Sequence, residues 1–189
     1  IRDRYYAAEG DFANAGSANI YYNDKIDRGL ASVGLGQNGY YRTLLANAPK
    51  FHNGNLLYAL ELSHYNGPWD TPDNYRKYNG LLRYSEGTSA NGFNLTAMAY
   101  SGKWNSTDQI PYDDYKQGKI SRFAAMDTSS GANASRYSLS GEWRRADASG
   151  TWLAQAYVIQ NFLDLYSNFE YAPDSQFNQR DSRVTSGLN

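Results

Sequence analysis

Aromatic side chains gather in the polar stretches between strand-like segments of this sequence. Their rings can stack on the flat or sugar-like face of a ligand, and neighbouring carboxylate and amide groups can supply hydrogen bonds. Binding by such a surface needs no covalent chemistry. We therefore predict a ligand-binding surface formed by Trp69, Asp70, Tyr75, Trp104, Asp108, Gln109 and Tyr112.

Some of these rings have a second interpretation. Tyr and Trp also collect at the boundary between a membrane and water, where they need no ligand. Trp69 and Trp104 fit both interpretations. The remaining prominent rings are expected at this boundary or in contact with lipid, and they are Tyr58, Tyr84, Trp143 and Phe169.

Catalytic and metal-binding patterns are not found in the sequence. His52 and His64 lack the spacing of a metal pair, and Asp113 and Asp114 are interpreted as part of a solvated loop. No nucleotide-binding or nucleophile motif occurs. The absence of Cys excludes thiolate chemistry and disulfide bonds in these 189 residues. We expect no enzyme, no catalytic residue, no metal site and no cofactor.

The charge balance also narrows the function. Lys and Arg number 18 against 19 Asp and Glu, giving a net charge of −1. Without a basic surplus to neutralise phosphates, nucleic acid is not an expected partner. No apolar run approaches the roughly 18–20 residues of a membrane helix.

The segment 55–65 has the alternation of a β-strand with two different faces. Leu56, Tyr58, Leu60 and Leu62 share one parity, and only Leu57 places a large apolar side chain on the other. The segment 75–85 repeats this alternation. Further strands are predicted at 29–37, 40–47, 91–101, 135–145, from 151 to about 160 and on through 161–171, and at 177–186, with short strand-like pieces near 4–7 and 18–22.

The connections between these strands alternate in length. Asn38-Gly39 is a strong signal for a tight hairpin. From residue 48 onward, short connections alternate with long ones, the longest at 102–134. An outer-membrane barrel has this rhythm, with short turns at one rim and long loops at the other. The rhythm therefore favours an all-β, antiparallel transmembrane barrel over a soluble β-sandwich.

Charged residues recur on the polar parity of the strands. They have two interpretations: a lumen lining that contacts substrate or an internal plug, or cross-strand ion pairs that keep the wall hydrated. The second is favoured. The residues concerned are Glu61, Lys77, Arg83, Glu142 and Arg144.

Several motifs together resemble the TonB-dependent outer-membrane receptors. Tyr5-Tyr6-Ala7, Glu9-Gly10-Asp11-Phe12 and Ala15-Gly16-Ser17-Ala18 resemble the exit of that family's plug domain, and 29–47 its first barrel hairpin. The segments 65–69, 76–80, 82–85 and 104–111 are similar to the following loops and strands of a proteobacterial subgroup.

The resemblance implies two domains: residues 1–27 as the carboxyl end of the plug, and residues 28–189 as about eight strands of a plugged barrel of about 22 strands. It implies a location in the bacterial outer membrane, in contact with its lipid. It also implies that the chain is part of a longer receptor, whose preceding region contacts the energy-transducing TonB protein.

The expected function is energised import of a scarce small molecule such as a siderophore-like metal chelate. Two alternatives remain open on the sequence alone. A passive porin would share the strand pattern but lack a plug-like segment such as 1–27. A soluble β-sandwich could bind carbohydrate through its Tyr and Trp residues.

Overall fold

A computed structural model describes residues 21–170 and 175–189 of the chain. The strand-like piece expected near 4–7 lies outside these residues, as does most of the plug segment 1–27. Tyr21 and Tyr22 are not part of a strand, so the described end of the piece expected at 18–22 does not have the predicted conformation.

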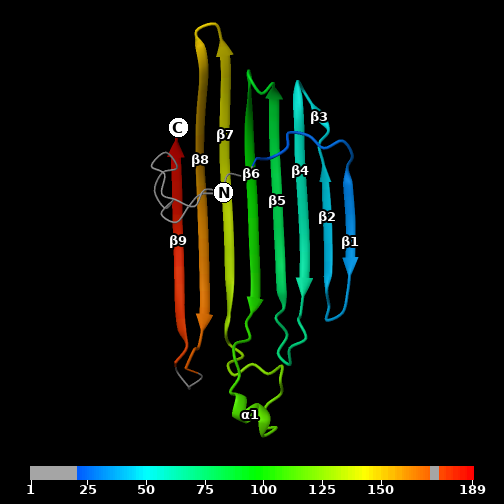
Figure 1. Cartoon of the computed structure of the whole chain (residues 1–189), viewed down its shortest axis with the longest axis vertical. Helices are drawn as coiled ribbons and strands as arrows, with labels where there is room; N and C mark the ends of the chain where they lie inside the picture. The colour runs from blue at the N-terminus through cyan, green and yellow to red at the C-terminus, as the bar shows by residue number, and fades with distance from the viewer. Residues whose placement is uncertain (1–20, 171–174) are drawn as a thin grey trace.

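The described residues form one antiparallel sheet, as predicted, in which each strand pairs with the next along the chain (Figure 1). The two-residue β3 lies off this path and pairs with β4. Within the described residues the sheet is open, because β1 and β9 each pair on one side only. The strands are β1 (Leu30–Leu35), β2 (Tyr41–Asn47), β3 (Lys50–Phe51), β4 (Gly54–Tyr65), β5 (Tyr75–Gly87), β6 (Gly92–Asn105), β7 (Gly131–Asp147), β8 (Gly150–Ser167) and β9 (Phe177–Leu188).

The predicted hairpin between β1 and β2 is confirmed. Asn38 and Gly39 have φ of 55° and 68°, the left-handed conformation at both central positions that a tight hairpin of the favoured hand requires. The amide of Tyr40 donates to the carbonyl oxygen of Gln37 at 3.1 Å and closes the turn. The sequence signal was sufficient here because the turn is local.

The alternation of short and long connections becomes a difference between the two ends of the sheet. The short turns after β5 and β7 lie at one end, and the connections 66–74 and 106–130 lie at the other, together with the described residues 168–170 and 175–176 that link β8 and β9 (Figure 1). We call the second end the long-loop end. The 106–130 connection contains a helix, α1 (Tyr112–Lys116), that was not predicted. Pro111 precedes this helix, and Asp113 and Asp114 in its first turn complement the helix dipole.

Both strands beside the longest connection extend further than predicted. β6 continues to Asn105 rather than ending at 101, and β7 begins at Gly131 rather than 135. The two strands remain paired there, from Lys103 with Asn133 to Asn105 with Gly131. Backbone pairing therefore continues where the side-chain alternation gives no signal. The predicted segments from 151 to about 160 and on through 161–171 form one continuous strand, β8, which ends at Ser167.

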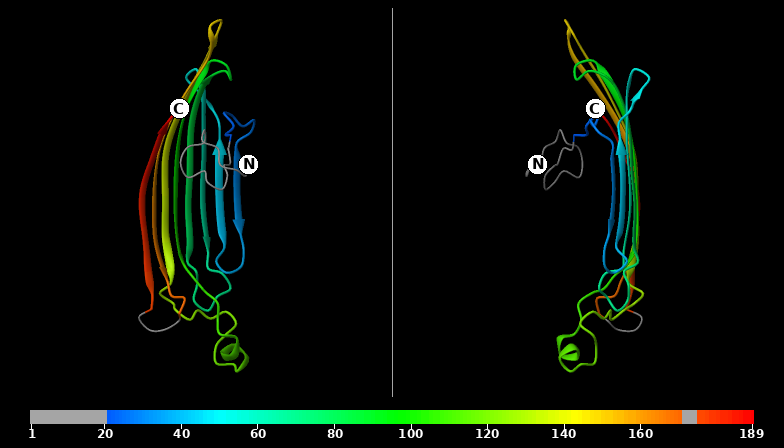
Figure 2. Two further views of the ribbon diagram at one scale, coloured as in Figure 1. Left: turned by 60° about the vertical axis from the view of Figure 1, so that its left-hand side comes forward. Right: turned by 90° about the vertical axis from the view of Figure 1, so that its right-hand side faces the viewer.

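The sheet is bowed, and residues 21–29 and α1 lie on its concave side in both views of Figure 2. The two faces differ in chemistry. In β4 to β7 the convex face carries the apolar parity, and its side chains are open: Leu60 is 53% exposed, Leu139 46% and Trp143 46%. The concave face of these strands carries the polar parity, and here Arg83 and Thr96 are only 9% and 3% exposed. By contrast, β8 places Ile159, Leu163 and Leu165 on this face.

Burial is therefore the reverse of that in a water-soluble globule. Among the described residues, the only buried hydrophobic side chains are Leu57 and Ala132. Leu57, the exception to the alternation, lies opposite Arg83 and so belongs to the concave face. The sheet has no apolar core of its own. Its large apolar side chains form an exposed surface instead.

Aromatic residues border the aliphatic centre of the convex face at both ends. Near the short turns, the ring of Tyr84 lies 6.2 Å from that of Phe51 and 5.7 Å from that of Phe93. Trp143 lies opposite Phe93 on the next strand. Toward the long-loop end, the strand alternation places Tyr41, Tyr78, Tyr137, Phe162 and Tyr166 on the same face.

Candidate ligand-binding site at the long-loop end

The connections 66–74 and 106–130 pack together beyond the ends of β4 to β7. The amide of Asp70 donates to the carbonyl oxygen of Phe123 at 3.0 Å. The backbone amide of Asn105 donates to the carbonyl oxygen of Asp73 at 2.7 Å. The side-chain Nδ2 of Asn105 donates to the carbonyl oxygen of Pro72 at 2.8 Å. These bonds tie two segments that are far apart in sequence into one assembly.

Trp69 forms the aromatic centre of this assembly. Its indole Nε1 donates to Oδ2 of Asp73 at 2.9 Å, and its ring meets that of Phe123 edge-on with 6.1 Å between centroids. Burial raises the pKa of Asp73 above its ordinary value, and the hydrogen bond from Trp69 opposes that rise in part. Trp69 thus has partners within the chain on both its edge and its nitrogen.

Asp127 joins the 106–130 connection to the 168–176 connection. Its Oδ1 accepts from the amide and hydroxyl of Ser129 at 2.8 and 2.5 Å, and its Oδ2 accepts from Nδ2 of Asn168 at 2.8 Å. The hydrogen bonds from Ser129, followed by that from Asn168, lower the pKa of Asp127. The carboxylate is therefore stabilised in its charged form. All three long connections are linked.

Tyr75 and Trp104 lie together at the edge of the concave face. Their ring centroids are 6.4 Å apart and the rings meet edge-on. The strand alternation places both residues on the polar face. Gly102 lies two residues before Trp104 on the same face, and the ring of Tyr100 occupies the space that its missing side chain leaves. This pair presents a mixed aromatic and polar surface toward the side on which residues 21–29 lie.

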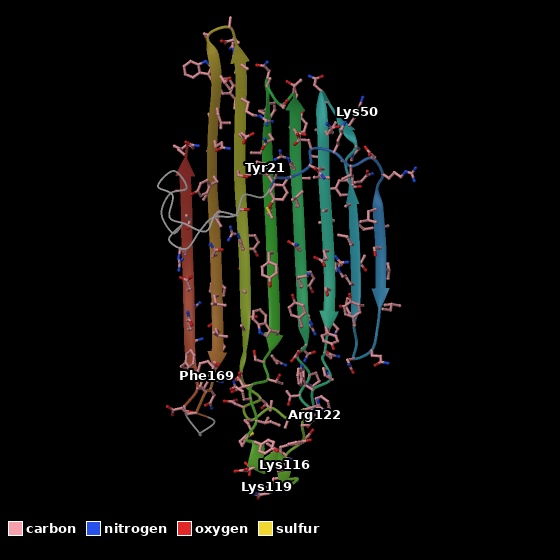
Figure 3. All side chains as sticks on the ribbon, viewed as in Figure 1. Tyr21, Lys50, Lys116, Lys119, Arg122 and Phe169 are labelled. Atoms are coloured by element: carbon pink, nitrogen blue, oxygen red, sulfur yellow. The ribbon has the colours of Figure 1, made fainter. Side chains whose placement is uncertain are left out.

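The other predicted site residues are more dispersed. Asp108 and Gln109 lie between β6 and α1, and Tyr112 begins α1 with 67% of its surface exposed. The ring of Tyr112 lies 5.3 Å from the ammonium of Lys116. Figure 3 places Lys116 and Lys119 at the far tip of this assembly, away from the sheet. The structure thus gathers Trp69 and Asp70 in one group and Tyr75 and Trp104 in another, with Tyr112 outside both.

The sequence pattern does not reveal some of the residues that organise the site. Phe123, Asp73 and Asp127 hold the long connections together, yet they lie in stretches without periodicity. Nothing in the sequence pairs Phe123 with Trp69. The proximity of Asp73 to Trp69, four residues apart, was the one available signal.

A second polar site lies on the concave face, where residues 21–25 cross the sheet. Arg83 Nη2 and Nε lie 2.7 and 2.9 Å from Oδ1 of Asp24, and its Nη1 donates to Asn94 and Thr96 at 2.9 and 2.7 Å. The hydroxyl of Tyr22 donates to the sulfur of Met98 at 3.3 Å. A cavity of about 370 Å³ lies between this segment and the sheet.

The charged residues of the polar parity divide between the two interpretations. Glu61 lies 2.6 Å from Arg42 on β2 and 3.0 Å from Lys77 on β5, which is the expected cross-strand pairing. Glu142 pairs with Arg144 on its own strand at 3.2 Å. Arg83 differs, because its carboxylate partner belongs to the segment that precedes the sheet.

No protein-family model matches this chain, and no curated protein or solved structure is significantly similar to it. In the part of the chain that the structure describes, no helix is long and apolar enough to cross a membrane. Within the same residues, no group of three or more His, Cys, Asp and Glu side chains could hold a metal ion.

Proposed function

We propose that this chain forms part of the wall of a transmembrane β-barrel in the bacterial outer membrane, and that the barrel belongs to a receptor that imports a scarce solute. The observation that carries the proposal is the reversed burial of the sheet. Leu60, Leu139 and Trp143 are about half exposed on the convex face, whereas Arg83 and Thr96 are buried on the concave one. Water disfavours such a surface, and lipid favours it.

Strand length and aromatic placement support a membrane location. The strands β4 to β9 contain 12 to 18 residues each, against the roughly 9–11 that a tilted strand needs to span the apolar layer. The aliphatic centre between two aromatic borders matches the pattern of a lipid-facing barrel surface. An open edge in lipid would leave backbone groups unpaired, so further strands must pair with β1 and β9.

The contact between Asp24 and Arg83 supports a plugged receptor over a passive porin. A segment that precedes the barrel and is held against its inner wall is what a plug domain requires. The ion-paired lining formed by Arg42, Glu61 and Lys77 is suited to a hydrated interior. On this account the concave face lines the lumen.

The long-loop end is the proposed ligand-binding side. Long loops of outer-membrane barrels lie outside the cell, where a solute arrives. Tyr75 and Trp104 at the inner edge are the best placed to contact a solute that enters the lumen. Trp69 has mainly a supporting role in this proposal, since Asp73 and Phe123 already occupy its nitrogen and ring edge.

Uptake would involve binding and release without covalent chemistry. Solute binding at the loops and plug would be transmitted through the plug, and energy from the inner membrane, delivered by the TonB protein, would drive release. A siderophore-like metal chelate is the proposed class of solute. The resemblance of the sequence to TonB-dependent receptors, together with the docked segment at Asp24, supports this choice.

The test is uptake of labelled ferric chelates of the hydroxamate and catecholate classes by cells with and without the full native protein. We expect saturable uptake that stops when the inner-membrane proton gradient is collapsed. Uptake of many small solutes that persists without the gradient would point instead to a porin. A native protein that is soluble and monodisperse without detergent would contradict the membrane location altogether.

A further inference from the structure

Two cations face each other on the convex side of the sheet at the long-loop end. Arg76 on β5 lies directly opposite Lys103 on β6, and both side chains are exposed. The strand alternation places them on the face of Tyr78, at its boundary with the polar loops. Opposed residues on antiparallel strands have Cα atoms roughly 5 Å apart, so like charges there repel.

Neither cation has a carboxylate partner among the described residues, whereas most strand cations do. Lys77, the neighbour of Arg76, pairs with Glu61 on the concave face. The residues paired with them on the outer neighbouring strands are His64 on β4, opposite Arg76, and Asn133 on β7, opposite Lys103. Neither is acidic. The strand cations with a carboxylate within 3.3 Å are Arg42, Lys77, Arg83, Arg144, Arg145 and Arg183.

A groove leads from these cations down the apolar face. Arg76 and Lys103 border two hollows. The first, of about 220 Å³, lies beside Asn74 and Asn105, and the second has a volume of about 400 Å³. Tyr78 and Tyr137 line that second hollow and also a third of about 400 Å³. The third is walled by aliphatic side chains, among them Leu45, Leu60 and Leu62. Small residues, Gly80 and Ala99, border it, so the apolar surface is hollowed there.

We propose that Arg76 and Lys103 bind the phosphate of a phosphorylated membrane lipid whose acyl chain lies in this groove. The inference rests on the proposal that the convex face meets lipid. A guanidinium presents paired donors that match phosphate geometry, and an adjacent ammonium adds charge. The phosphate removes the repulsion between the two cations. The apolar hollow walled by Leu45, Leu60 and Leu62 favours a lipid over a free anion, since inorganic phosphate has nothing to place there.

The experiment uses the full native protein, purified in a neutral detergent, and measures bound lipid by native mass spectrometry. The probes are phosphatidic acid, phosphatidylcholine and inorganic phosphate. For the wild type we expect preferential retention of phosphatidic acid over phosphatidylcholine. Each cation near a lipid surface contributes about 1 kcal/mol, so the double variant R76Q/K103Q should lose roughly 10- to 30-fold of that preference.

Two further variants make the outcome specific. K116Q/K119Q removes the same charge at the end of α1 and in the turn after it, away from the groove, and should keep the preference of the wild type (Figure 3). The exchange R76K/K103R retains both charges and should keep most of the preference for phosphatidic acid. This variant shows whether substitution at the two positions disrupts folding when the charge is kept. Equal preference in wild type and R76Q/K103Q, or displacement of the lipid by inorganic phosphate alone, would overturn the inference.

Failure of the inference and failure of the proposed function give different results. If the protein requires detergent and binds both lipids equally, the convex face meets lipid but Arg76 and Lys103 do not select a phosphate. If the protein stays soluble without detergent and retains neither lipid, the membrane location itself is wrong, and this inference with it.

Discussion

Asp24 and Arg83 connect the segment that precedes the sheet to the interior of its concave face, with 2.7 Å between Oδ1 and Nη2. Arg83 is the more buried partner, at 11% side-chain exposure against 47% for Asp24. Its remaining hydrogen bonds, to Asn94 and Thr96, fix the guanidinium in the wall of the sheet. Arg83 is therefore a preformed receptor for a carboxylate, and residues 21–25 supply it.

Replacing Asp24 by Asn should loosen this segment without disturbing the sheet. The ion pair is partly exposed, so we expect a cost of about 1 kcal/mol, or roughly a fivefold rise in local opening. Hydrogen exchange at residues 21–29 measures this. Asp27→Asn is the matched control, since Asp27 is exposed and has no ion pair within the described residues. Equal exchange in both variants would show that the carboxylate does not hold the segment.

Substitution on the two faces should have opposite consequences. Leu139→Lys places a charge on the convex face, where a lipid-facing position near the bilayer centre costs about 2–4 kcal/mol. Ser138→Lys places the same charge on the concave face and should cost about 1 kcal/mol or less. Unfolding of the full protein in lipid vesicles gives both values. Leu139→Lys without effect would indicate that this face meets water.

Asp73→Asn should stabilise the packing of the long connections at neutral pH. Burial raises the pKa of Asp73, so the unfolded chain gives up this proton at lower pH than the folded chain. Well below the ordinary Asp pKa of 3.8, the carboxyl is protonated in both the folded and the unfolded state, and variant and wild type should agree. The penalty develops as the pH rises from there through the folded pKa. Hydrogen exchange of residues 66–74, compared between variant and wild type at each pH, measures this difference. Equal exchange at every pH would show that the carboxylate is well hydrated and carries no penalty.

Asp127→Asn should have the opposite sign. Hydrogen bonds from Ser129 and Asn168 lower the pKa of Asp127, so its stabilising contribution is present above about pH 4 and is lost as the pH falls through the folded pKa. The variant should loosen 168–170 and 175–176 at neutral pH, by at most about 1 kcal/mol because the site is solvated. The difference from wild type should vanish in acid. A difference that persists unchanged in acid would exclude this origin.

The sheet was predictable because its evidence is local and repeated. Leu56, Tyr58 and Leu60 assign a face to β4 without reference to any other strand, and Asn38-Gly39 specifies its own hairpin. The ordering of neighbouring strands followed from the lengths of the connections. Backbone pairing beyond Ser101 was missed, because it continues into residues that do not alternate.

The site was predictable only in part. The contacts of Trp69 with Phe123, and of Asp127 with Asn168, join residues 54 and 41 positions apart that follow no period. Arg76 and Lys103 are visible in the sequence as exceptions, because each is a charged residue on the apolar parity of its strand. For these two residues, the departure from the alternation indicates the candidate lipid site, which the alternation itself does not.

The central claim is that the convex face of the sheet meets lipid and the concave face meets water. Spin labels at Leu139→Cys and Ser138→Cys test it most directly, because the two neighbours face opposite sides and these 189 residues contain no native Cys that would compete for the label. In the full protein in bilayers, the label at 139 should collide mainly with oxygen, which partitions into lipid, and the label at 138 with a water-soluble nickel complex. Equal access of the nickel complex to both labels would contradict the account.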